Sequence, residues 1–229
     1  MKKMKAIVLL SGGLDSTVCM AVARDQGFEP LPISFNYQQR HAREVECARK
    51  VAEFYNVSRH LVIDTNMAAI GGSALTDAAV GVPSGDVTRQ DIPVTYVPAR
   101  NLIFLSYALG YAEVTGADHI FIGVNALDYS GYPDCRPEFI QLFQQLADYS
   151  TKASVADGRK IKIETPLIQL SKQEIVKLGV RLAAPLELTT SCYRGGDVAC
   201  GTCDSCLLRL KGFAEAGLKD PIAYSEGVR

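Results

Sequence analysis

Short apolar runs alternate along the chain with longer segments of mixed polarity. The run at 6–10 consists of five apolar residues, the pattern of a strand buried on both faces of a parallel sheet. Between such runs, apolar residues recur at helical spacing, as they do from Val45 to Tyr55. Strands are therefore predicted at 6–10, 31–36, 60–64, 120–124 and 161–163. Helices are predicted at 16–25, 40–55, 101–114, 137–149, from Ser171 to a stop at Gly179, and at 207–216.

The order of these elements predicts an α/β fold, namely a Rossmann-like, doubly wound parallel sheet with helices on both faces. The pattern breaks down at 66–98, where glycines and prolines predict a long insertion with at most a short helix. This insertion either closes over a bound ligand or forms an inert surface or a dimer contact. Ligands of doubly wound sheets bind where the strand order reverses, which is expected here between the first and fourth strands.

Composition narrows the class of protein. The 229 residues suffice for one large domain, or for a domain with an appendage. Lys and Arg number 24 against 25 Asp and Glu, so the chain lacks the basic excess that binding to a nucleic-acid backbone requires. No apolar run approaches the ~20 residues that span a bilayer, and the first run is too short for a signal peptide. We expect a cytoplasmic protein with a small-molecule substrate and no nucleic-acid or membrane partner.

The loop Ser11–Thr17 follows the first predicted strand and leads into the first predicted helix. Backbone N–H groups, the helix dipole and three hydroxyl groups converge there on a space the size of an anion. Gly12 and Gly13 allow the positive φ angles and the close backbone approach that such a cradle needs. The loop lacks the lysine of a Walker motif and does not match the dinucleotide fingerprint. We interpret it as a phosphate-binding loop, the alternative being a glycine-rich turn that binds nothing.

Polar residues crowd the segment that follows the fourth predicted strand. This segment is expected to form the floor of the crevice beside the phosphates, because strands one and four are predicted neighbours. So many polar side chains in one loop favour a substrate pocket. The alternatives are a satisfied turn at Asn125 and Asp134 and a surface ion pair between Arg136 and Glu138. The candidate residues are Asn125, Asp128, Tyr129, Asp134, Arg136 and Glu138.

Two further segments are expected to face the same crevice. Phe35 and Tyr37 end the second predicted strand at the same sheet edge, where an aromatic face and backbone groups suit adenine. The alternative is a strand end packed on a helix. Arg100 stands at the start of a predicted helix and is a candidate for substrate binding, with an ordinary surface arginine as the alternative.

Four of the seven cysteines lie close together near the C-terminus. An odd number of cysteines without a secretory signal argues against a disulfide framework. Cys192, Cys200, Cys203 and Cys206 have the spacing of four thiolates that close tetrahedrally on zinc at about 2.3 Å. We predict structural zinc, with an iron–sulfur cluster as the alternative. Cys135 in the predicted pocket is either a covalent nucleophile or an inert thiol.

The segment S-G-G-L-D-S at 11–16 resembles the pyrophosphate loop (PP-loop) of ATP pyrophosphatases. Together with Val97–Asn101, Gly123–Phe139 and the four cysteines, it makes the chain resemble the QueC family of 7-cyano-7-deazaguanine synthases along essentially its whole length. The resemblance implies an adenine nucleotide alpha hydrolase-like domain at 1–185 and a helical, zinc-knuckle extension at 186–229. It also implies a homodimer, with ATP, Mg²⁺ and structural Zn²⁺ as cofactors.

The resemblance further implies a ligase of queuosine precursor biosynthesis that converts 7-carboxy-7-deazaguanine and ammonia into the nitrile. ATP would activate first the carboxylate and then the amide. Attack at the α-phosphate would give an adenylate and pyrophosphate, whereas attack at the γ-phosphate would release ADP and phosphate. Two alternatives stay open. One is another PP-loop enzyme, such as a tRNA-modifying thiolase or an amidotransferase-type ligase, and the other is a non-catalytic ATP-binding zinc module.

The expected site falls into four sets of residues. Catalytic roles are expected for Asp15, Ser16, Asp128 and Arg136. ATP is expected to contact Leu10, Ser11, Gly12, Gly13, Leu14, Asp15, Ser16, Thr17, Phe35 and Tyr37. The substrate is expected to contact Arg100, Asn125, Asp128, Tyr129, Asp134, Arg136 and Glu138, and the metal to bind Cys192, Cys200, Cys203 and Cys206.

Overall fold

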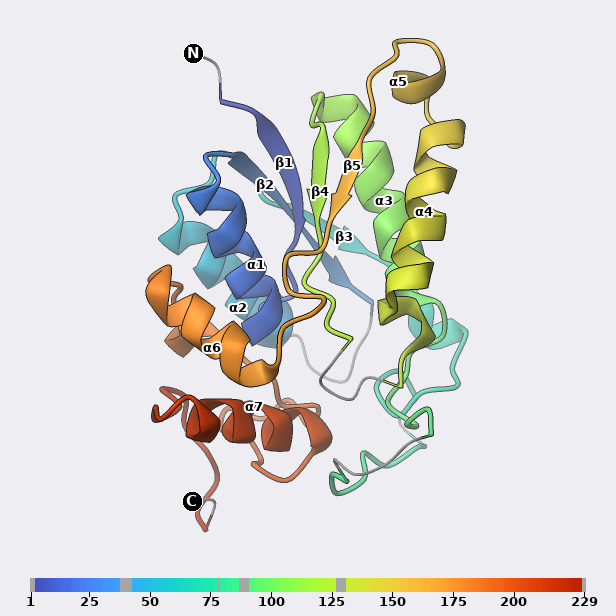
Figure 1. Ribbon diagram of the computed structural model, residues 1–229. Helices are drawn as coiled ribbons and strands as arrows, with labels where there is room; N and C mark the ends of the chain where they lie inside the picture. The colour runs from blue at the N-terminus through green and yellow to red at the C-terminus, as the bar shows by residue number, and fades with distance from the viewer. Residues whose placement is uncertain (1–2, 38–42, 78, 87–90, 127–130, 228–229) are drawn as a thin grey trace.

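The computed structural model describes residues 3–37, 43–77, 79–86, 91–126 and 131–227, and a parallel sheet lies at its centre (Figure 1). In the described residues the sheet has five strands in the order β3-β2-β1-β4-β5, and every neighbouring pair is parallel. The predicted doubly wound sheet is confirmed. The strands are β1 (Lys5–Leu9), β2 (Glu29–Asn36), β3 (Leu61–Asp64), β4 (His119–Phe121) and β5 (Lys162–Glu164).

Helices cover both faces of the sheet (Figure 1). Successive residues of β1 point to opposite faces, so that Ile7 and Leu9 belong to one hydrophobic core and Ala6 and Val8 to the other. Helices α3 and α4 complete the first core, and α1, α2 and α6 complete the second. The helices are α1 (Leu14–Asp25), α2 (Arg43–Phe54), α3 (Arg100–Thr115), α4 (Pro137–Ser150), α5 (Lys152–Val155), α6 (Lys172–Arg181) and α7 (Asp204–Glu215).

The strand order reverses at β1, as predicted. Ile7 of β1 lies opposite Leu31 of β2 on one side and opposite Ile120 of β4 on the other. The chain therefore leaves β1 and β4 at the same edge of the sheet, where ligands of such folds bind. A Cβ on Gly123, just after β4, would lie 3.0 Å from the carbonyl carbon of Asp15 in α1. The absence of a side chain at Gly123 lets this segment pass the start of α1.

Several predicted boundaries are off by a few residues, as at α1, which begins at Leu14 rather than Ser16, and two further helix boundaries are wrong for a reason of packing or capping. Gly179 does not end α6, which continues past it, and a Cβ there would lie 2.8 Å from Cγ2 of Val18 in α1. This glycine allows α6 to pack closely on α1, a contact that periodicity along the chain does not reveal. Helix α7 begins at Asp204 rather than at Leu207, with Cys203 as its N-cap. The last cysteine of the cluster therefore lies in the first turn of this helix.

The insertion at 66–98 is irregular in its described part apart from turns and one short 3-10 helix, η1 (Met67–Ala69), in agreement with the prediction. Its middle packs on the cysteine-rich segment, because the N–H of Gly85 donates to the carbonyl oxygen of Thr202 at 2.7 Å. A Cβ on Gly85 would lie 2.7 Å from the backbone nitrogen of Asp204, so this contact requires glycine. The insertion is thereby attached to the C-terminal extension.

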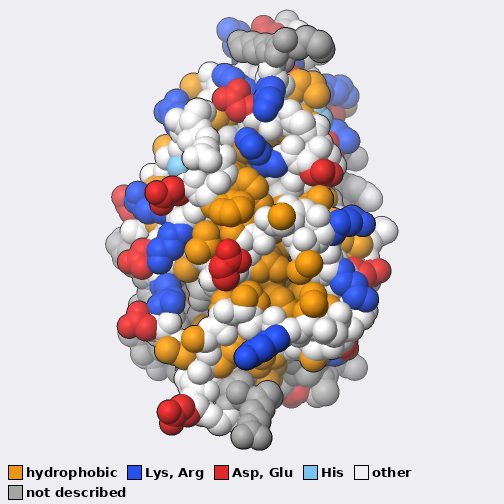
Figure 2. All heavy atoms as spheres, turned by 90° about the vertical axis from the view of Figure 1, so that its left-hand side faces the viewer, with side chains coloured by type: hydrophobic (Ala, Val, Ile, Leu, Met, Phe, Trp, Pro, Cys, Tyr) orange, Lys and Arg blue, Asp and Glu red, His pale blue; other side chains and the backbone are white. Residues whose placement is uncertain are grey.

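Figure 2 shows the face that carries α1, α2 and α6. Hydrophobic side chains gather in the middle of this face, and acidic and basic side chains are mixed around them. Phe54 of α2 is 49 % exposed and Val180 of α6 is 51 % exposed. Among the described side chains that Figure 2 draws in colour, the basic ones are interspersed with acidic ones and form no continuous stripe. Among the described helices, none combines the length and the apolar character needed to cross a membrane.

Candidate functional site

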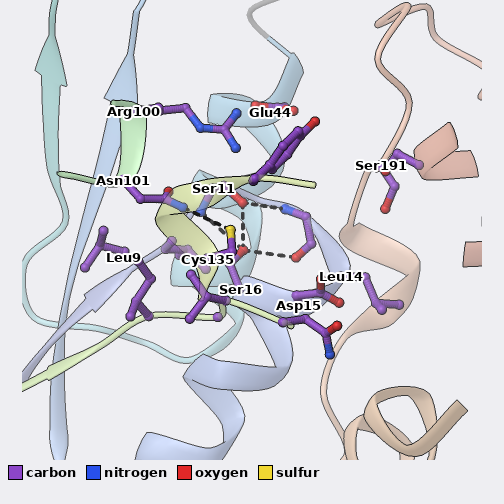
Figure 3. Close-up of a pocket in the computed structure, with 18 of the residues that line it drawn as sticks. Leu9, Ser11, Leu14, Asp15, Ser16, Glu44, Arg100, Asn101, Cys135 and Ser191 are labelled. Carbon is purple, nitrogen blue, oxygen red and sulfur yellow. Dashed lines mark hydrogen bonds between the residues drawn. The ribbon is translucent and has the colours of Figure 1, made fainter. Parts of the chain in front are cut away.

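A cavity opens at the carboxyl ends of β1, β2 and β4 (Figure 3). Its walls come from the loop after β1, the end of β2, the first turns of α2 and α3, the segment after β4, and the C-terminal extension. The predicted phosphate loop and part of the predicted pocket therefore share one cavity. The candidates that line it are Leu10, Ser11, Gly13, Leu14, Asp15, Ser16, Phe35, Tyr37, Arg100 and Asn125.

Two serines connect the loop after β1 to the start of α1. The hydroxyl of Ser11 donates to Oγ of Ser16 at 3.0 Å, and the hydroxyl of Ser16 donates to the carbonyl oxygen of Gly13 at 3.0 Å. Gly13 is the N-cap of α1, and no side chain caps this helix. The N–H groups of its first turn and the positive end of its dipole are therefore available to an anion in the cavity.

Gly12 lets the loop pack closely against the start of α2. Its φ is +85°, and a Cβ there would lie 2.2 Å from the carbonyl oxygen of Glu44 in α2, so only glycine fits. Thr17 is fully buried and does not line the cavity, and its Oγ1 has no hydrogen-bond partner among the described residues. The loop thus presents serine hydroxyls and N–H groups to the cavity rather than the hydroxyl of Thr17.

Lys172, which was not a candidate, forms an ion pair with Asp15 at the cavity. Its Nζ lies 2.9 and 2.8 Å from the two carboxylate oxygens, and its side chain is only 13 % exposed. The stem of Lys172 passes Gly212 of α7, where a Cβ would lie 2.4 Å from Cγ of the lysine. Along the chain, Lys172 appears only as the residue after Ser171, the N-cap of α6. No local signal identifies it.

The aromatic residues at the end of β2 are buried and line the cavity. The ring of Phe35 is stacked on that of Phe104 in α3, with 3.9 Å between the centroids and 3° between the planes. Nη1 of Arg100 donates to the hydroxyl oxygen of Tyr37 at 3.4 Å. Burial raises the pKa of Tyr37 to about 12, so its phenol is neutral near pH 7. This end of the cavity combines aromatic surface with a cation.

Arg100 begins α3, and Glu44 lies in the first turn of α2 (Figure 3). Burial acts to lower the pKa of Arg100, but the tyrosines and the carboxylate around it raise the pKa, so the guanidinium stays charged. Burial raises the pKa of Glu44, and the charge of Arg100 opposes this. Ala99 has a φ of +55°, a strained angle for alanine, at the point where Arg100 enters the cavity. Sequence reasoning missed Glu44 because it looks like a solvent-facing residue of an amphipathic helix.

Two tyrosines close this end of the cavity, and neither was a candidate. The hydroxyl oxygen of Tyr132 lies 3.0 Å from Oγ1 of Thr95 and 3.4 Å from the hydroxyl oxygen of Tyr193. Burial raises the pKa of Tyr193 well above its ordinary value. Thr95 belongs to the insertion, and Tyr193 follows the first cysteine of the cluster. Three segments that are far apart in the sequence therefore meet at this point.

Asp134 forms hydrogen bonds with Asn101 rather than facing the cavity. Its buried carboxylate accepts from the backbone N–H of Asn101 at 2.9 Å, in the first turn of α3. Nδ2 of Asn101 donates to the carbonyl oxygen of Asp134 at 3.1 Å and to Sγ of Cys135 at 3.3 Å. Asn101 and Cys135 line the cavity, whereas Asp134 does not. The hydrogen bonds of Asp134 are therefore those of a turn whose polar groups are satisfied within the protein, which was the alternative to substrate binding.

The other candidates after β4 have different surroundings. Nδ2 of Asn125 donates to carbonyl groups of the segment 167–170, so this side chain fixes a turn while it lines the cavity. Arg136 and Glu138 are exposed at the start of α4 and do not line the cavity. Asp128 and Tyr129 lie outside the described residues.

The four C-terminal cysteines converge as predicted. Their sulfur atoms all lie within 4.8 Å of one another, and Sγ of Cys200 lies 3.9 Å from Sγ of Cys206. Four ligands at 2.3 Å from one zinc ion stand about 3.8 Å apart, so this donor set fits a single ion. The N–H of Cys200 donates to Sγ of Cys192 at 3.3 Å, and the N–H of Cys203 donates to Sγ of Cys200 at 3.4 Å. All seven cysteines are free of disulfides.

Arg209 of α7 holds the C-terminal extension against the cavity. Its buried guanidinium donates to both carboxylate oxygens of Asp220, at 2.7 and 2.9 Å. It also donates to Oγ of Ser191, which lines the cavity, at 3.4 Å. Next to this serine, the N–H of Thr190 donates to the carbonyl oxygen of Gly12 at 3.0 Å. The extension therefore forms part of the wall beside the phosphate loop.

The parallel sheet and the loop S-G-G-L-D-S at the end of β1 define a PP-loop protein with an adenine nucleotide alpha hydrolase-like fold. The model of the family described as Queuosine biosynthesis protein QueC matches residues 5–217. The chain belongs to this family.

Named relatives match the chain along nearly their whole length. The protein named 7-cyano-7-deazaguanine synthase 2 of Desulfitobacterium hafniense is 62% identical over 221 residues, which are 96% of this chain and 93% of the relative. The 7-cyano-7-deazaguanine synthase of Acetivibrio thermocellus is 58% identical over 222 residues, 97% of this chain and 98% of the relative. Among solved structures, a 4-thiouridine synthetase in complex with RNA and ATP has a TM-score of 0.49 and 18% identity, over 93% of this chain and 50% of that one.

Proposed function

We propose that this chain is an ATP-dependent ligase that converts 7-carboxy-7-deazaguanine and ammonia into 7-cyano-7-deazaguanine in queuosine precursor biosynthesis. The observation that carries the proposal is that one cavity joins the anion-binding start of α1 to a pocket that contains Arg100 and Glu44. The family assignment supports it, as do the names of relatives at 62% and 58% identity.

The reaction has to remove two oxygen atoms from a carboxyl group. A carboxylate is a poor electrophile, so ATP first turns one oxygen into a leaving group that ammonia displaces to give the amide. ATP then activates the amide oxygen, and its departure with loss of protons leaves the nitrile. In sum, one acid, one ammonia and two ATP give one nitrile, and both carboxyl oxygens leave bonded to phosphorus. Both steps need the acid close to the phosphates, which a shared cavity provides.

The start of α1 is the proposed site of the ATP phosphates. Ser11, Gly13, Ser16 and the first-turn N–H groups would hold the pyrophosphate, which favours attack of the substrate at the α-phosphate. Lys172 lies in the same cavity and places a cation beside it. Asp15 supplies one carboxylate, and because Mg²⁺ takes one or two carboxylates together with phosphate oxygens, Asp15 and ATP would hold this ion jointly. Bound there, Mg²⁺ would neutralise charge on the phosphates.

The adenine of ATP is proposed to lie at the end of β2, beside Phe35 and Tyr37, where buried aromatic side chains line the cavity. Asn101 and Cys135 line the same cavity (Figure 3). Arg136 and Glu138 take no part in the proposed site, because they are exposed outside the cavity lining. The expected roles of Asp128 and Tyr129 stay predictions.

The metal at the four cysteines is proposed to be structural zinc. In a [4Fe–4S] cluster each cysteine binds a different iron atom, and in a [2Fe–2S] cluster the four cysteines are divided between two iron atoms, so some of the cysteine sulfurs stand further apart than around one ion. The separation of at most 4.8 Å between the cysteine sulfurs therefore supports a single tetrahedral ion. Four cysteine ligands leave no position for a substrate, which supports a structural role. The domain boundary at 185–186, the homodimer and the cytoplasmic location stay predictions.

A PP-loop enzyme that modifies tRNA is the main alternative, and a turnover assay separates the two. The protein is incubated with ATP, Mg²⁺, ammonia and 7-carboxy-7-deazaguanine, with and without bulk tRNA, and nucleotide consumption is followed. The proposal expects ATP consumption that depends on the free acid and is unchanged by tRNA. Turnover that requires tRNA, or no turnover with the free acid, would contradict it. ATP binding without any cleavage would instead identify a non-catalytic module.

A further inference from the structure

Glu44 and Arg100 lie next to each other at one end of the cavity but do not form an ion pair (Figure 3). In the described part of the chain, the carboxylate of Glu44 has no hydrogen-bond or ion-pair partner. The side chain of Arg100 donates a single hydrogen bond there, the one to Tyr37 at 3.4 Å. A guanidinium has five N–H donors and a carboxylate has two acceptor oxygens. Both groups therefore have hydrogen-bonding capacity left for a molecule in the cavity.

The fold holds these two groups in place at a cost. Glu44 is half-buried, so its carboxylate loses part of its hydration without gaining a hydrogen bond, and this burial raises the pKa of Glu44. The start of α2 is fixed by the close contact of Gly12 with the Glu44 carbonyl, and Arg100 follows the strained backbone of Ala99. Opposite charges that are held near each other but unpaired suit a ligand that offers donors to one and an acceptor to the other.

We propose that Glu44 and Arg100 bind the ring edge of the acid substrate, an inference that rests on the proposed function. The carboxylate of Glu44 accepts hydrogen bonds from the ring N–H and from the amino group beside it. Arg100 donates to the ring carbonyl oxygen on the other side of that N–H. A guanine-type edge presents this order of one acceptor and two donors, and two parallel hydrogen bonds suit a carboxylate.

The base of ATP fits the same pair less well. Adenine offers one amino group beside a ring nitrogen that only accepts, so it leaves one oxygen of Glu44 without a donor. The aromatic surface of Phe35 and Tyr37 needs no such pattern of donors. We therefore assign Glu44 and Arg100 to the acid substrate and not to the nucleotide.

The test compares two compounds and two variants. The compounds are 7-carboxy-7-deazaguanine and its analogue without the amino group, and the variants are Glu44→Gln and, as a matched control, Glu46→Gln on the exposed side of the same helix turn. In calorimetry, the wild-type protein should bind the analogue about 10- to 100-fold more weakly than the acid. Glu44→Gln should raise the KM for the acid by a similar factor, leave the KM for ATP within about twofold, and bind both compounds alike. Glu46→Gln should behave as the wild type.

Two results would overturn this assignment. One is a wild-type protein that binds both compounds equally, and the other is a Glu44→Gln variant whose KM changes for ATP but not for the acid. Failure of the proposed function is distinguishable, because it appears as a wild-type protein that does not turn over the acid at all. In that case the calorimetric comparison of the two compounds still decides whether Glu44 recognises the amino group.

Discussion

At the scale of single residues, Lys172 is the side chain that most changes the expected site. It brings a cation to Asp15 at the start of α1, where the proposal places pyrophosphate. Replacing Lys172 by Met removes that cation and leaves the carboxylate of Asp15 without its ion pair. We expect kcat/KM for ATP to fall by about 100-fold or more, as is typical when a charge-stabilising group is lost. Steady-state kinetics at saturating acid measures the change.

The matched control for this variant is Lys177→Met, on an exposed position of the same helix. It removes the same charge from α6 but lies away from Asp15, so its kcat/KM should stay within about twofold of the wild type. Thermal unfolding of both variants checks that the helix still packs. Wild-type activity in Lys172→Met would remove this lysine from the proposed mechanism.

We expect His60 to make the stability of the protein depend on pH. Its Nε2 lies 2.7 Å from Oγ of Ser34, whose hydroxyl donates to the carbonyl oxygen of Leu10 at the cavity wall. Burial, with a smaller effect of the Arg49 charge, lowers the pKa of His60 to about 4, against 6.5 for the free side chain. As the pH falls below 6.5, the unfolded chain binds a proton that the folded chain takes up only near pH 4. Stability from this group is therefore complete above pH 6.5 and is lost toward pH 4.

Thermal unfolding at several pH values between 7.5 and 4.5 tests the role of His60. The Tm of the wild type should fall more steeply with decreasing pH than the Tm of His60→Gln, which keeps a hydrogen-bonding side chain but does not titrate. Acid effects common to the whole molecule cancel in this comparison. Parallel curves for the two proteins would mean that His60 titrates normally.

At the scale of elements, Gly179 determines how closely α6 packs on α1. A methyl group there would lie 2.8 Å from Cγ2 of Val18, and alanine's better helix propensity offsets only about 1 kcal/mol of the resulting strain. We expect Gly179→Ala to lower the free energy of unfolding by about 1–2 kcal/mol in urea denaturation. Gly110→Ala in the exposed face of α3 meets no atom within 4 Å and should instead raise it by about 0.5–1 kcal/mol. Equal effects of the two substitutions would contradict this packing argument.

Features that depend on residues close together in the chain could be predicted from the sequence, whereas contacts between distant residues could not. The strands and most helices follow from periodicity, and the loop Ser11–Ser16 and the cysteine cluster follow from spacing, because their residues lie close together in the chain. Gly179 was predicted to end α6, but it instead makes room for Val18 of α1. Because Val18 belongs to another helix, the local sequence does not reveal this contact. Asp15 and Lys172 are 157 positions apart, so no local pattern joins them. Glu44 and Arg100 are likewise brought together only by the fold.

At the scale of the whole molecule, the cysteine cluster connects metal binding to the active site. Tyr193 and Thr190 beside Cys192 form part of the cavity wall, and Thr190 is hydrogen-bonded to Gly12. Loss of the metal should therefore reduce both stability and activity, since metal affinity contributes directly to folding. Cys203→Ser should lose its zinc, have a lower Tm and lose most of its turnover.

Elemental analysis of the purified protein provides the readout for this prediction. We expect one zinc ion per chain in the wild type and in Cys47→Ala, which alters a buried thiol outside the cluster. A chelator strong enough to remove zinc should lower the Tm of both proteins to the level of Cys203→Ser. Iron in place of zinc, or full activity of the metal-free protein, would contradict the structural zinc site.

If this chain makes a nitrile from an acid, the mass of the product will show it. The purified protein is given ATP, Mg²⁺, 7-carboxy-7-deazaguanine and ¹⁵N-labelled ammonia, and the product is examined by mass spectrometry. We predict a compound that has lost both carboxyl oxygens and gained one ¹⁵N atom. A product that stops at the amide, or a recovered acid without ¹⁵N, would contradict it.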